Sequence, residues 1–332
     1  MRVIFTVIAL LAGFLAVHAT YAATLPGIPE FIDEMVTKHQ FSRSELEKVF
    51  ARAQHRPDVI EAISRPATIK PWTEYRAAFV NSKRVKLGLE FWSKYQLTLR
   101  RAEQKYGVPQ DIIVAVIGVE TIYGRNAGSF LVLDALTTLA FDYPRRAPFF
   151  RSELENYLLL ARDQQFDLLA IHGSYAGAMG IPQFMPSSYR NYAVDFNGNR
   201  SVDLLREEID AIGSVAHYLQ GYGWTRDEPV AARAQIRGGL ADGTGKTPRS
   251  LAEWTAAGVV TGADFAPDTH GAQEPLRGKY ARLLDFTLQE GKEFWLAFNN
   301  FEVITRYNNS DFYAMSVFQL AEELKAARKS GK

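Results

Sequence analysis

The chain has 332 residues, of which 47% are hydrophobic and 12% aromatic, with 38 basic side chains against 37 acidic ones and no cysteine. This composition is typical of a globular protein. It excludes disulfides, cysteine-rich metal sites, cysteine nucleophiles and lipid attachment through cysteine. The net charge of +1 excludes a global basic field, so nucleic acid is not an expected partner.

The N-terminus has the pattern of a secretory signal peptide over residues 1–23. Arg2 precedes an apolar run from Val3 to Val17, and small residues follow up to Ala23. The run is shorter than the roughly 20 residues that a membrane-spanning helix needs, and no later run is long enough to span. We therefore expect an exported, soluble, periplasmic protein without a membrane span.

Residues 24–225 are expected to form a helical body. Apolar residues recur at helical spacing from Phe31 to Tyr106. Residues 170–188 are rich in Gly, Ala, Ser and Pro, which predicts a structured loop or very short helices. Further helices are predicted at residues 109–123, 150–162, 209–222 and 311–327.

Residues 226–300 differ from the rest in composition. They contain many Gly, Ala, Thr, Asp and Pro residues with weak periodicity, and residues 230–236 alternate as a strand does. We predict a small α/β insertion on the helical body. Residues 301–332 are expected to return to that body as a C-terminal segment and helix, with a brief extended stretch at residues 303–307. The predicted fold class is mainly α, with a minor β part (α+β).

A single ionisable residue, Glu120, stands between Asp111 and Arg125 in an otherwise apolar predicted helix. A helix that is apolar on all sides is buried, and burial raises the pKa of a carboxyl group, so that a proton remains available near neutral pH. The alternative is a structural glutamate paired with an arginine such as Arg145 or Arg146. The helix by itself does not decide between them.

A second segment, residues 173–189, combines small residues with polar and aromatic ones. Its three glycines and two alanines allow the backbone to approach a ligand closely, while Ser174, Gln183 and the aromatic residues offer polar groups and stacking faces. The alternative is a tight helix crossing that needs small residues. This segment alone is weak support for a binding site.

Four motifs follow one another along the chain. They read GVET at 118–121, YPRRA at 143–147, AGAMGIPQFMPSSY at 176–189 and RYNNS at 306–310. In order and spacing they resemble the membrane-bound lytic murein transglycosylase B family over residues 31–324. The resemblance implies a catalytic core similar to goose-type lysozyme, with extra N-terminal helices. It also implies lyase-type cleavage of the β-1,4 bond between N-acetylmuramic acid and N-acetylglucosamine of peptidoglycan, which forms 1,6-anhydromuramic ends without water.

The resemblance also implies roles for individual residues. Glu120 would be the single catalytic residue, first as acid and then as base. We find no second carboxylate in the motifs, which agrees with a mechanism that uses the substrate's N-acetyl oxygen as nucleophile. No cofactor is required for this chemistry. The implied substrate-binding residues are Ser174, Gln183, Phe184, Tyr307, Asn308, Arg145, Arg146 and Tyr75.

Residues 195–203 stand where this family carries a calcium loop similar to an EF-hand. The expected oxygen ligands of a structural Ca²⁺ are Asp195, Asn197, Asn199 and Ser201, with Asp210 or Glu207 as the closing carboxylate. Arg200 departs from the pattern, because the sixth position of such a loop is normally glycine. The alternative is a turn that is held by its own Asp and Asn side chains without metal.

Two other functions remain open at the level of sequence. A lysozyme-like muramidase would use water in place of the C6 hydroxyl, and a non-catalytic peptidoglycan-binding protein would have no use for a buried acid. Some members of the family are lipoproteins attached through a cysteine at the signal cleavage site, where this chain has Ala22, Ala23 and Thr24. We therefore expect no lipid anchor.

Overall fold

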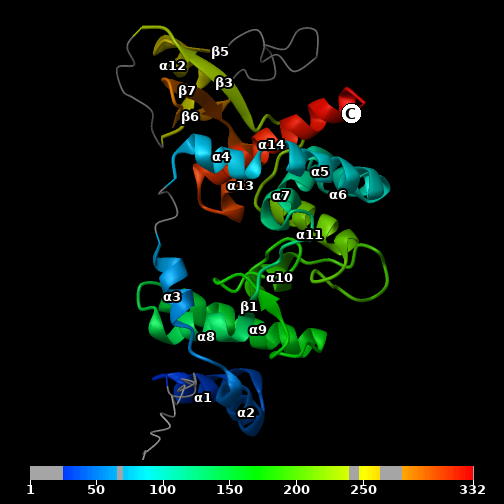
Figure 1. Cartoon of the computed structure of the whole chain (residues 1–332), viewed down its shortest axis with the longest axis vertical. Helices are drawn as coiled ribbons and strands as arrows, with labels where there is room; N and C mark the ends of the chain where they lie inside the picture. The colour runs from blue at the N-terminus through cyan, green and yellow to red at the C-terminus, as the bar shows by residue number, and fades with distance from the viewer. Residues whose placement is uncertain (1–24, 66–69, 239–246, 262–278, 332) are drawn as a thin grey trace, which may run out of the picture.

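The computed structural model describes residues 25–65, 70–238, 247–261 and 279–331 (Figure 1). The predicted signal peptide, residues 1–23, lies outside them. The described chain is mainly helical with a two-stranded and a five-stranded sheet, which confirms the predicted fold class. No helix in these ranges is both long enough and apolar enough to cross a membrane.

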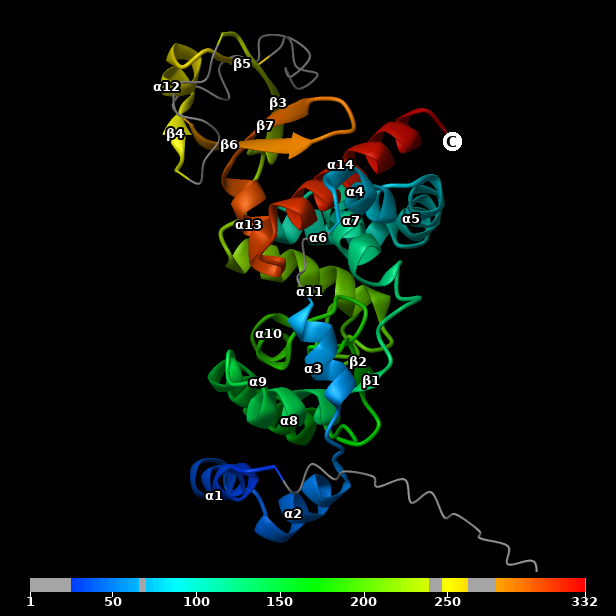
Figure 2. The same ribbon diagram turned by 60° about the vertical axis from the view of Figure 1, so that its left-hand side comes forward.

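The helices at one end of the molecule are formed by the N-terminal segment and by the segment around residue 140. Figure 2 shows α1 and α2 against α8 and α9, with α3 beside α8. Phe31 joins them, because its ring meets Phe50 at 6.0 Å and Phe141 at 5.8 Å. The bounds are α1 Ile28–His39, α2 Arg43–Arg52, α3 Pro57–Ser64, α8 Val132–Asp142 and α9 Ala147–Gln164.

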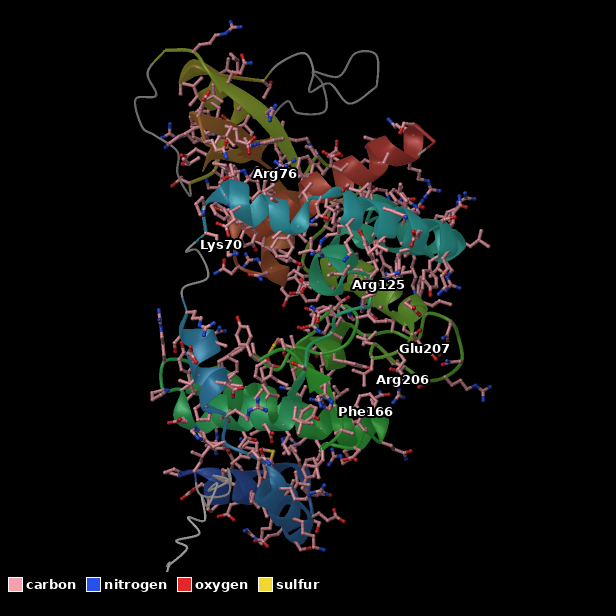
Figure 3. The ribbon with its side chains drawn as sticks, viewed as in Figure 1. Lys70, Arg76, Arg125, Phe166, Arg206 and Glu207 are labelled. Atoms are coloured by element: carbon pink, nitrogen blue, oxygen red, sulfur yellow. The ribbon has the colours of Figure 1, made fainter. Side chains whose placement is uncertain are left out.

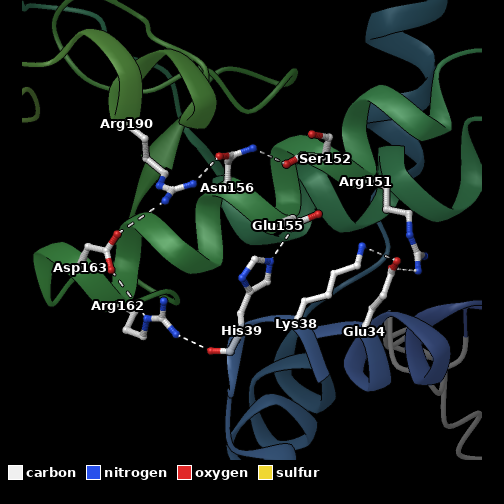
Figure 4. Close-up of polar contacts among 10 residues, drawn as sticks. All are labelled: Glu34, Lys38, His39, Arg151, Ser152, Glu155, Asn156, Arg162, Asp163 and Arg190. Atoms are coloured by element: carbon white, nitrogen blue, oxygen red, sulfur yellow. Dashed lines mark hydrogen bonds and ion pairs between the residues drawn. The ribbon is translucent and has the colours of Figure 1, made fainter. Parts of the chain in front are cut away.

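A polar network attaches α1 to α9 along their solvent-facing edges (Figure 4). The Glu34 carboxylate accepts hydrogen bonds from Lys38 at 2.9 Å and from Arg151 at 2.6 Å. His39 Nε2 lies 2.6 Å from a carboxylate oxygen of Glu155. These pairs add polar contacts at the edge of α1, while its apolar face, which includes Phe31, is buried.

The second helical group surrounds α7, whose residues from Ile112 to Val119 are all buried. The helices α5, α6, α11 and α14 pack directly on it. The predicted helix at 109–123 is therefore confirmed, as is its burial. The bounds are α4 Trp72–Phe79, α5 Ser82–Lys94, α6 Gln96–Tyr106, α7 Gln110–Thr121, α11 Glu208–Gly221, α13 Asn299–Tyr307 and α14 Asp311–Lys329.

Between the two helical groups lies the segment rich in small residues. It contains β2 (His172–Gly173), which pairs antiparallel with β1 (Phe130–Leu131), and the short helix α10 (Pro186–Tyr192). Figures 1 and 2 place α10, β1 and β2 between α8 and α9 on one side and α7 on the other. The prediction for residues 170–188, a structured loop or very short helices, is therefore confirmed.

An antiparallel sheet occupies the opposite end of the molecule (Figure 1). Its strand order is β4-β6-β7-β3-β5, and it has its own small core with α12 (Leu251–Ala256) around Trp254. Trp72 of α4 attaches the sheet to the helices, since its ring meets Phe286 at 4.6 Å and its Nε1 donates to Glu293 at 2.8 Å. The strands are β3 Ala231–Ile236, β4 Arg249–Ser250, β5 Val259–Thr261, β6 Tyr280–Thr287 and β7 Lys292–Ala297.

One sequence-based expectation about secondary structure was wrong. Residues 303–307 are not extended but form the second half of α13. The β-branched Val303, Ile304 and Thr305 favour a strand locally. However, Phe301 and Ile304 are fully buried at helical spacing, so tertiary packing of this face outweighs the local preference.

Candidate active site

Glu120 lies in the last turn of α7, where the buried helix reaches the surface. Its side chain keeps partial exposure, although the residues on either side of it are buried. Burial raises the pKa of Glu120 from 4.5 to about 7, and a hydrogen bond donated by the Tyr313 hydroxyl to Oε1 acts in the opposite direction. With this pKa the carboxyl group can both donate and accept a proton near neutral pH.

The alternative of a structural ion pair is not formed. Arg145 and Arg146 are exposed in the turn between α8 and α9. Among the described residues, no arginine or lysine shifts the pKa of Glu120. A buried carboxyl group that lacks a cationic partner is held mainly by its tyrosine neighbour.

Four tyrosines from four helices surround Glu120. Tyr313 of α14 donates to it, and the ring of Tyr307 from α13 stacks on Tyr313 at 6.4 Å with an interplanar angle of 16°. Tyr218 of α11 meets Tyr307 at 4.7 Å. Burial raises the pKa of Tyr75 on α4, and the charge of Glu120 adds to this increase. Burial likewise raises the pKa of the other three, so all four hydroxyls remain hydrogen-bond donors near neutral pH.

The chain turns sharply directly after Glu120. Ile122, Tyr123 and Gly124 all have left-handed backbone conformations, with φ values of 52°, 61° and 82°. Thr121 ties this turn to the following loop, because its hydroxyl donates to the Ile181 carbonyl at 2.8 Å and accepts from the Gly124 amide at 2.9 Å. A left-handed β-branched residue is strained, and such strain is typical of functional sites.

The small-residue loop is shaped by two of the predicted site residues. The Ser174 hydroxyl accepts backbone N–H bonds from Ala176 at 3.3 Å and Ala178 at 3.1 Å. The Gln183 side-chain amide donates to the carbonyls of Ala127 and Gly180, both at 2.9 Å. Their polar groups therefore hold the backbone of the loop, which leaves the hydroxyl hydrogen of Ser174 and the Oε1 atom of Gln183 for a ligand.

The remaining predicted residues differ in how close they are to Glu120. Phe184 is only 2% exposed and lies beneath Tyr307, with 5.8 Å between the ring centroids. Tyr307 donates to the Pro182 carbonyl at 2.6 Å, which joins α13 to the loop. Asn308 is exposed at the end of α13. Arg146 lies 4.3 Å above the Phe149 ring, and no contact joins it to the tyrosine cluster in the described ranges.

Sequence reasoning missed Tyr313 and Tyr218. Tyr313 is three residues beyond Ser310, whose hydroxyl caps α14 by accepting the Tyr313 backbone N–H at 3.3 Å. A tyrosine at the buried start of a helix, directly after a recognised motif, was a usable signal. Tyr218 lies in an apolar helix and offered no signal beyond its hydroxyl.

The loop at residues 195–203 is held by its own side chains. Asp195 accepts backbone N–H bonds from Gly198 at 2.6 Å and from Arg200 at 2.7 Å. Asn199 donates to the Glu207 carboxylate at 3.0 Å, and Asn197 also donates to it. Glu207 and Arg206 precede α11 (Figure 3).

Of the two candidates for a closing carboxylate, Glu207 faces the loop. Asp210 is fully buried, and its carboxylate oxygens accept hydrogen bonds from the backbone amides of Phe196, at 2.8 Å, and Asp203, at 3.0 Å. The described residues contain no cluster of three or more His, Asp or Glu side chains arranged to hold a metal. The oxygen donors at hand are one aspartate, one glutamate and two asparagine amides, a set that suits a hard cation such as Ca²⁺.

The family described as Transglycosylase SLT domain matches residues 25–322. The chain is 43% identical over 318 residues to membrane-bound lytic murein transglycosylase B of Escherichia coli (strain K12), covering 92% of this chain and 84% of that protein.

Two solved structures are similar throughout. The E. coli lytic transglycosylase Slt35 in complex with calcium is 42% identical, with a TM-score of 0.84, and the match covers 93% of this chain and 96% of that one. SltB3 of Pseudomonas aeruginosa in complex with NAG-anhNAM-pentapeptide is 31% identical, with a TM-score of 0.79, over 90% of this chain and 78% of that one.

Proposed function

Because this chain belongs to the Transglycosylase SLT domain family, we propose that it is a lytic murein transglycosylase with a lysozyme-like fold. It cleaves the β-1,4 bond between N-acetylmuramic acid and N-acetylglucosamine of peptidoglycan without water and leaves 1,6-anhydromuramic ends. The observation that carries this proposal is the environment of Glu120, a partly buried carboxyl group with a pKa of about 7 that accepts a hydrogen bond from Tyr313 within a cluster of tyrosines.

Glu120 acts first as the acid. Its proton passes to the glycosidic oxygen as the bond from that oxygen to muramic C1 breaks, and the N-acetyl oxygen of the same sugar bonds to C1. In the described ranges no second carboxylate acts on the pKa of Glu120, as expected where the substrate supplies the nucleophile. The Tyr313 hydroxyl stabilises the carboxylate that forms by donating a hydrogen bond to it.

Glu120 then acts as the base. The carboxylate takes the proton of the muramic C6 hydroxyl, O6 bonds to C1, and the bond from the N-acetyl oxygen to C1 breaks. Glu120 ends protonated as it began, and no water enters the product. This cycle requires a carboxyl group whose two forms have similar free energies, which a pKa near 7 supplies at neutral pH.

The proposed glycan contacts follow the same geometry. Tyr307 and Asn308 contact the sugar beside Glu120, with Tyr75 across from them, and Ser174 offers its free hydroxyl hydrogen. Gln183 and Phe184 line the proposed glycan-binding surface on the side of the loop. Arg145 and Arg146 bind carboxylates of peptide stems, because an exposed guanidinium group forms two parallel hydrogen bonds with a carboxylate.

The chemistry requires no cofactor, and a structural Ca²⁺ is part of the proposal. Slt35 is known in complex with calcium. Here Asp195, Asn197 and Asn199 would bind the ion, with Ser201 and either Glu207 or Asp210 completing the set. Glu207 is the better placed, because it already contacts both asparagines. The residues fit such an ion. The side-chain oxygens of Asp195, Asn197 and Asn199 accept backbone N–H bonds within the loop, whereas the carboxylate oxygens of Glu207 accept from side-chain amides.

The substrate also sets the location. Murein lies outside the cytoplasmic membrane, so we place the protein in the periplasm, exported by residues 1–23. The proposed units are the body at 24–225, the α/β insertion at 226–300 and the C-terminal segment at 301–332.

Mass analysis of the products released from purified sacculi tests the proposal. Anhydromuramic ends, each lighter by one water than a reducing end, are expected, and SltB3 has been solved with a ligand of this anhydro type. Reducing ends alone would show a hydrolytic muramidase. A Glu120→Gln variant that is folded but releases products at the wild-type rate would remove Glu120 from the mechanism. Binding without any release by the wild type would point to a non-catalytic protein.

A further inference from the structure

Arg84 is a buried cation on α5 that the proposed chemistry does not use. It is 9% exposed, and no carboxylate lies within ion-pair distance of it in the described part of the chain. Its guanidinium group donates to the carbonyls of Gly118 and Val119, the latter at 3.5 Å, and to that of Ala78 at 3.2 Å. All of its hydrogen-bond partners are therefore neutral carbonyl oxygens.

A buried charge without an ionic partner is unfavourable unless hydrogen bonds compensate it. Two of the three carbonyls that Arg84 binds, those of Gly118 and Val119, belong to the last turn of α7, and the third, that of Ala78, belongs to α4. The Gly118 carbonyl accepts one backbone N–H bond, from Ile122 at 3.2 Å, and Arg84 adds a second donor to it. A cation there also faces the negative end of the helix dipole. The two carbonyls are those of the residues directly before Glu120. Arg84 thus holds the end of the helix that carries the acid.

A second contact fixes the same turn from the opposite direction. Tyr123, whose backbone is left-handed, folds back beneath α7, and its hydroxyl donates to the Arg84 carbonyl at 2.9 Å. Two glycines leave room for this phenol. A Cβ atom on Gly118 would lie 2.6 Å from the Tyr123 oxygen, and one on Gly88 of α5 would lie 2.3 Å from it. The turn after Glu120 is therefore locked onto α5 through Arg84.

We propose that Arg84 is a positioning residue, which sets the place of the Glu120 carboxyl group by holding the last turn of α7 without touching the substrate. The proposal rests on the proposed function. The titratable groups that face Glu120 itself are Tyr75, Tyr218, Tyr307 and Tyr313, which come from other helices. Arg84 acts from beneath the helix end, on the side of α5.

Steady-state kinetics on soluble glycan fragments test this. In Arg84→Met the carbonyls of Gly118 and Val119 lose the guanidinium donor and the helix end shifts, so kcat falls by about 10- to 100-fold, up to the loss that a displacement of about 1 Å produces, while KM is unchanged. Arg84→Lys keeps the positive charge and one donor nitrogen in place of the guanidinium group, and recovers part of kcat. The matched control is Lys83→Met, which removes an exposed cation from the neighbouring position of α5 and leaves both constants at wild-type values.

Three outcomes would overturn the proposal. They are a folded Arg84→Met with the kcat of the Lys83→Met control, a change confined to KM, and an Arg84→Lys variant no better than Arg84→Met. Circular dichroism melting identifies variants that do not fold, and if Arg84→Met is one of them, a lowered kcat with unchanged KM in Arg84→Lys decides the matter. A failure of the proposed function gives a different result: Glu120→Gln would retain activity, whatever the kinetics of the Arg84 variants.

Discussion

Replacing Glu120 by glutamine should abolish lytic activity and, at alkaline pH, stabilise the fold. Burial raises the pKa of Glu120 from 4.5 to about 7. The native state therefore binds this proton more tightly than the unfolded chain does. The stabilisation is fully present below the unfolded pKa and is lost as pH rises through the folded pKa. Glutamine is neutral at every pH, so the variant does not lose stability through ionisation at this position as the wild type does.

The magnitude follows from the two pKa values. Each unit of pKa difference corresponds to 1.36 kcal/mol, so ionising Glu120 in the folded protein costs about 3 kcal/mol. Most of this change falls between pH 5 and pH 8.5. We expect the free energy of unfolding of Glu120→Gln, relative to wild type, to rise by about 2 to 3 kcal/mol across that interval.

Urea unfolding of both proteins at pH 5 and pH 8.5 measures this difference. The matched control is Glu90→Gln on α5, which changes an exposed glutamate and should show the same small difference at both pH values. If the Glu120→Gln difference does not grow with pH, the carboxyl group is not held in the protonated form by burial. The reasoning that makes it an acid at neutral pH would then be refuted.

Three further predictions concern the surroundings of Glu120 and the loop. Tyr313→Phe removes the hydrogen bond that lowers the pKa of Glu120, so the pKa of Glu120 should rise further. The alkaline limb of the pH profile of kcat/KM should then move to higher pH by about one unit. An alkaline limb at the wild-type pH would contradict this prediction. Gly118→Ala forces a methyl group against the Tyr123 phenol and should lower the free energy of unfolding by about 1 to 3 kcal/mol, measured in urea, whereas a neutral effect would show that Tyr123 can move. Added Ca²⁺ should raise the melting temperature of the wild type but not of Asp195→Asn, and equal shifts would place any ion elsewhere.

The sequence predicted a buried carboxyl group at Glu120 from a purely local feature, whereas its catalytic role came from the motifs. An apolar helix with one carboxyl group must be buried, and burial alone determines the direction of the pKa change. The helix at 109–123 was predicted to within a few residues for the same reason. In contrast, residues 303–307 were misassigned, because their β-branched side chains favour a strand and only the packing of α13 decides otherwise.

The partners of Glu120 required the tertiary structure. Tyr75, Tyr218, Tyr307 and Tyr313 come from four helices that are far apart in the chain, and a periodic pattern shows which face of each helix is buried but not which faces meet. For the same reason, the sequence did not predict the contact of Arg84 with the end of α7. By itself the sequence predicted the buried carboxyl group, its helix and the chemistry that the motifs imply. Only the tertiary structure decided what surrounds the acid and holds it in place, because those contacts join segments that no local pattern relates.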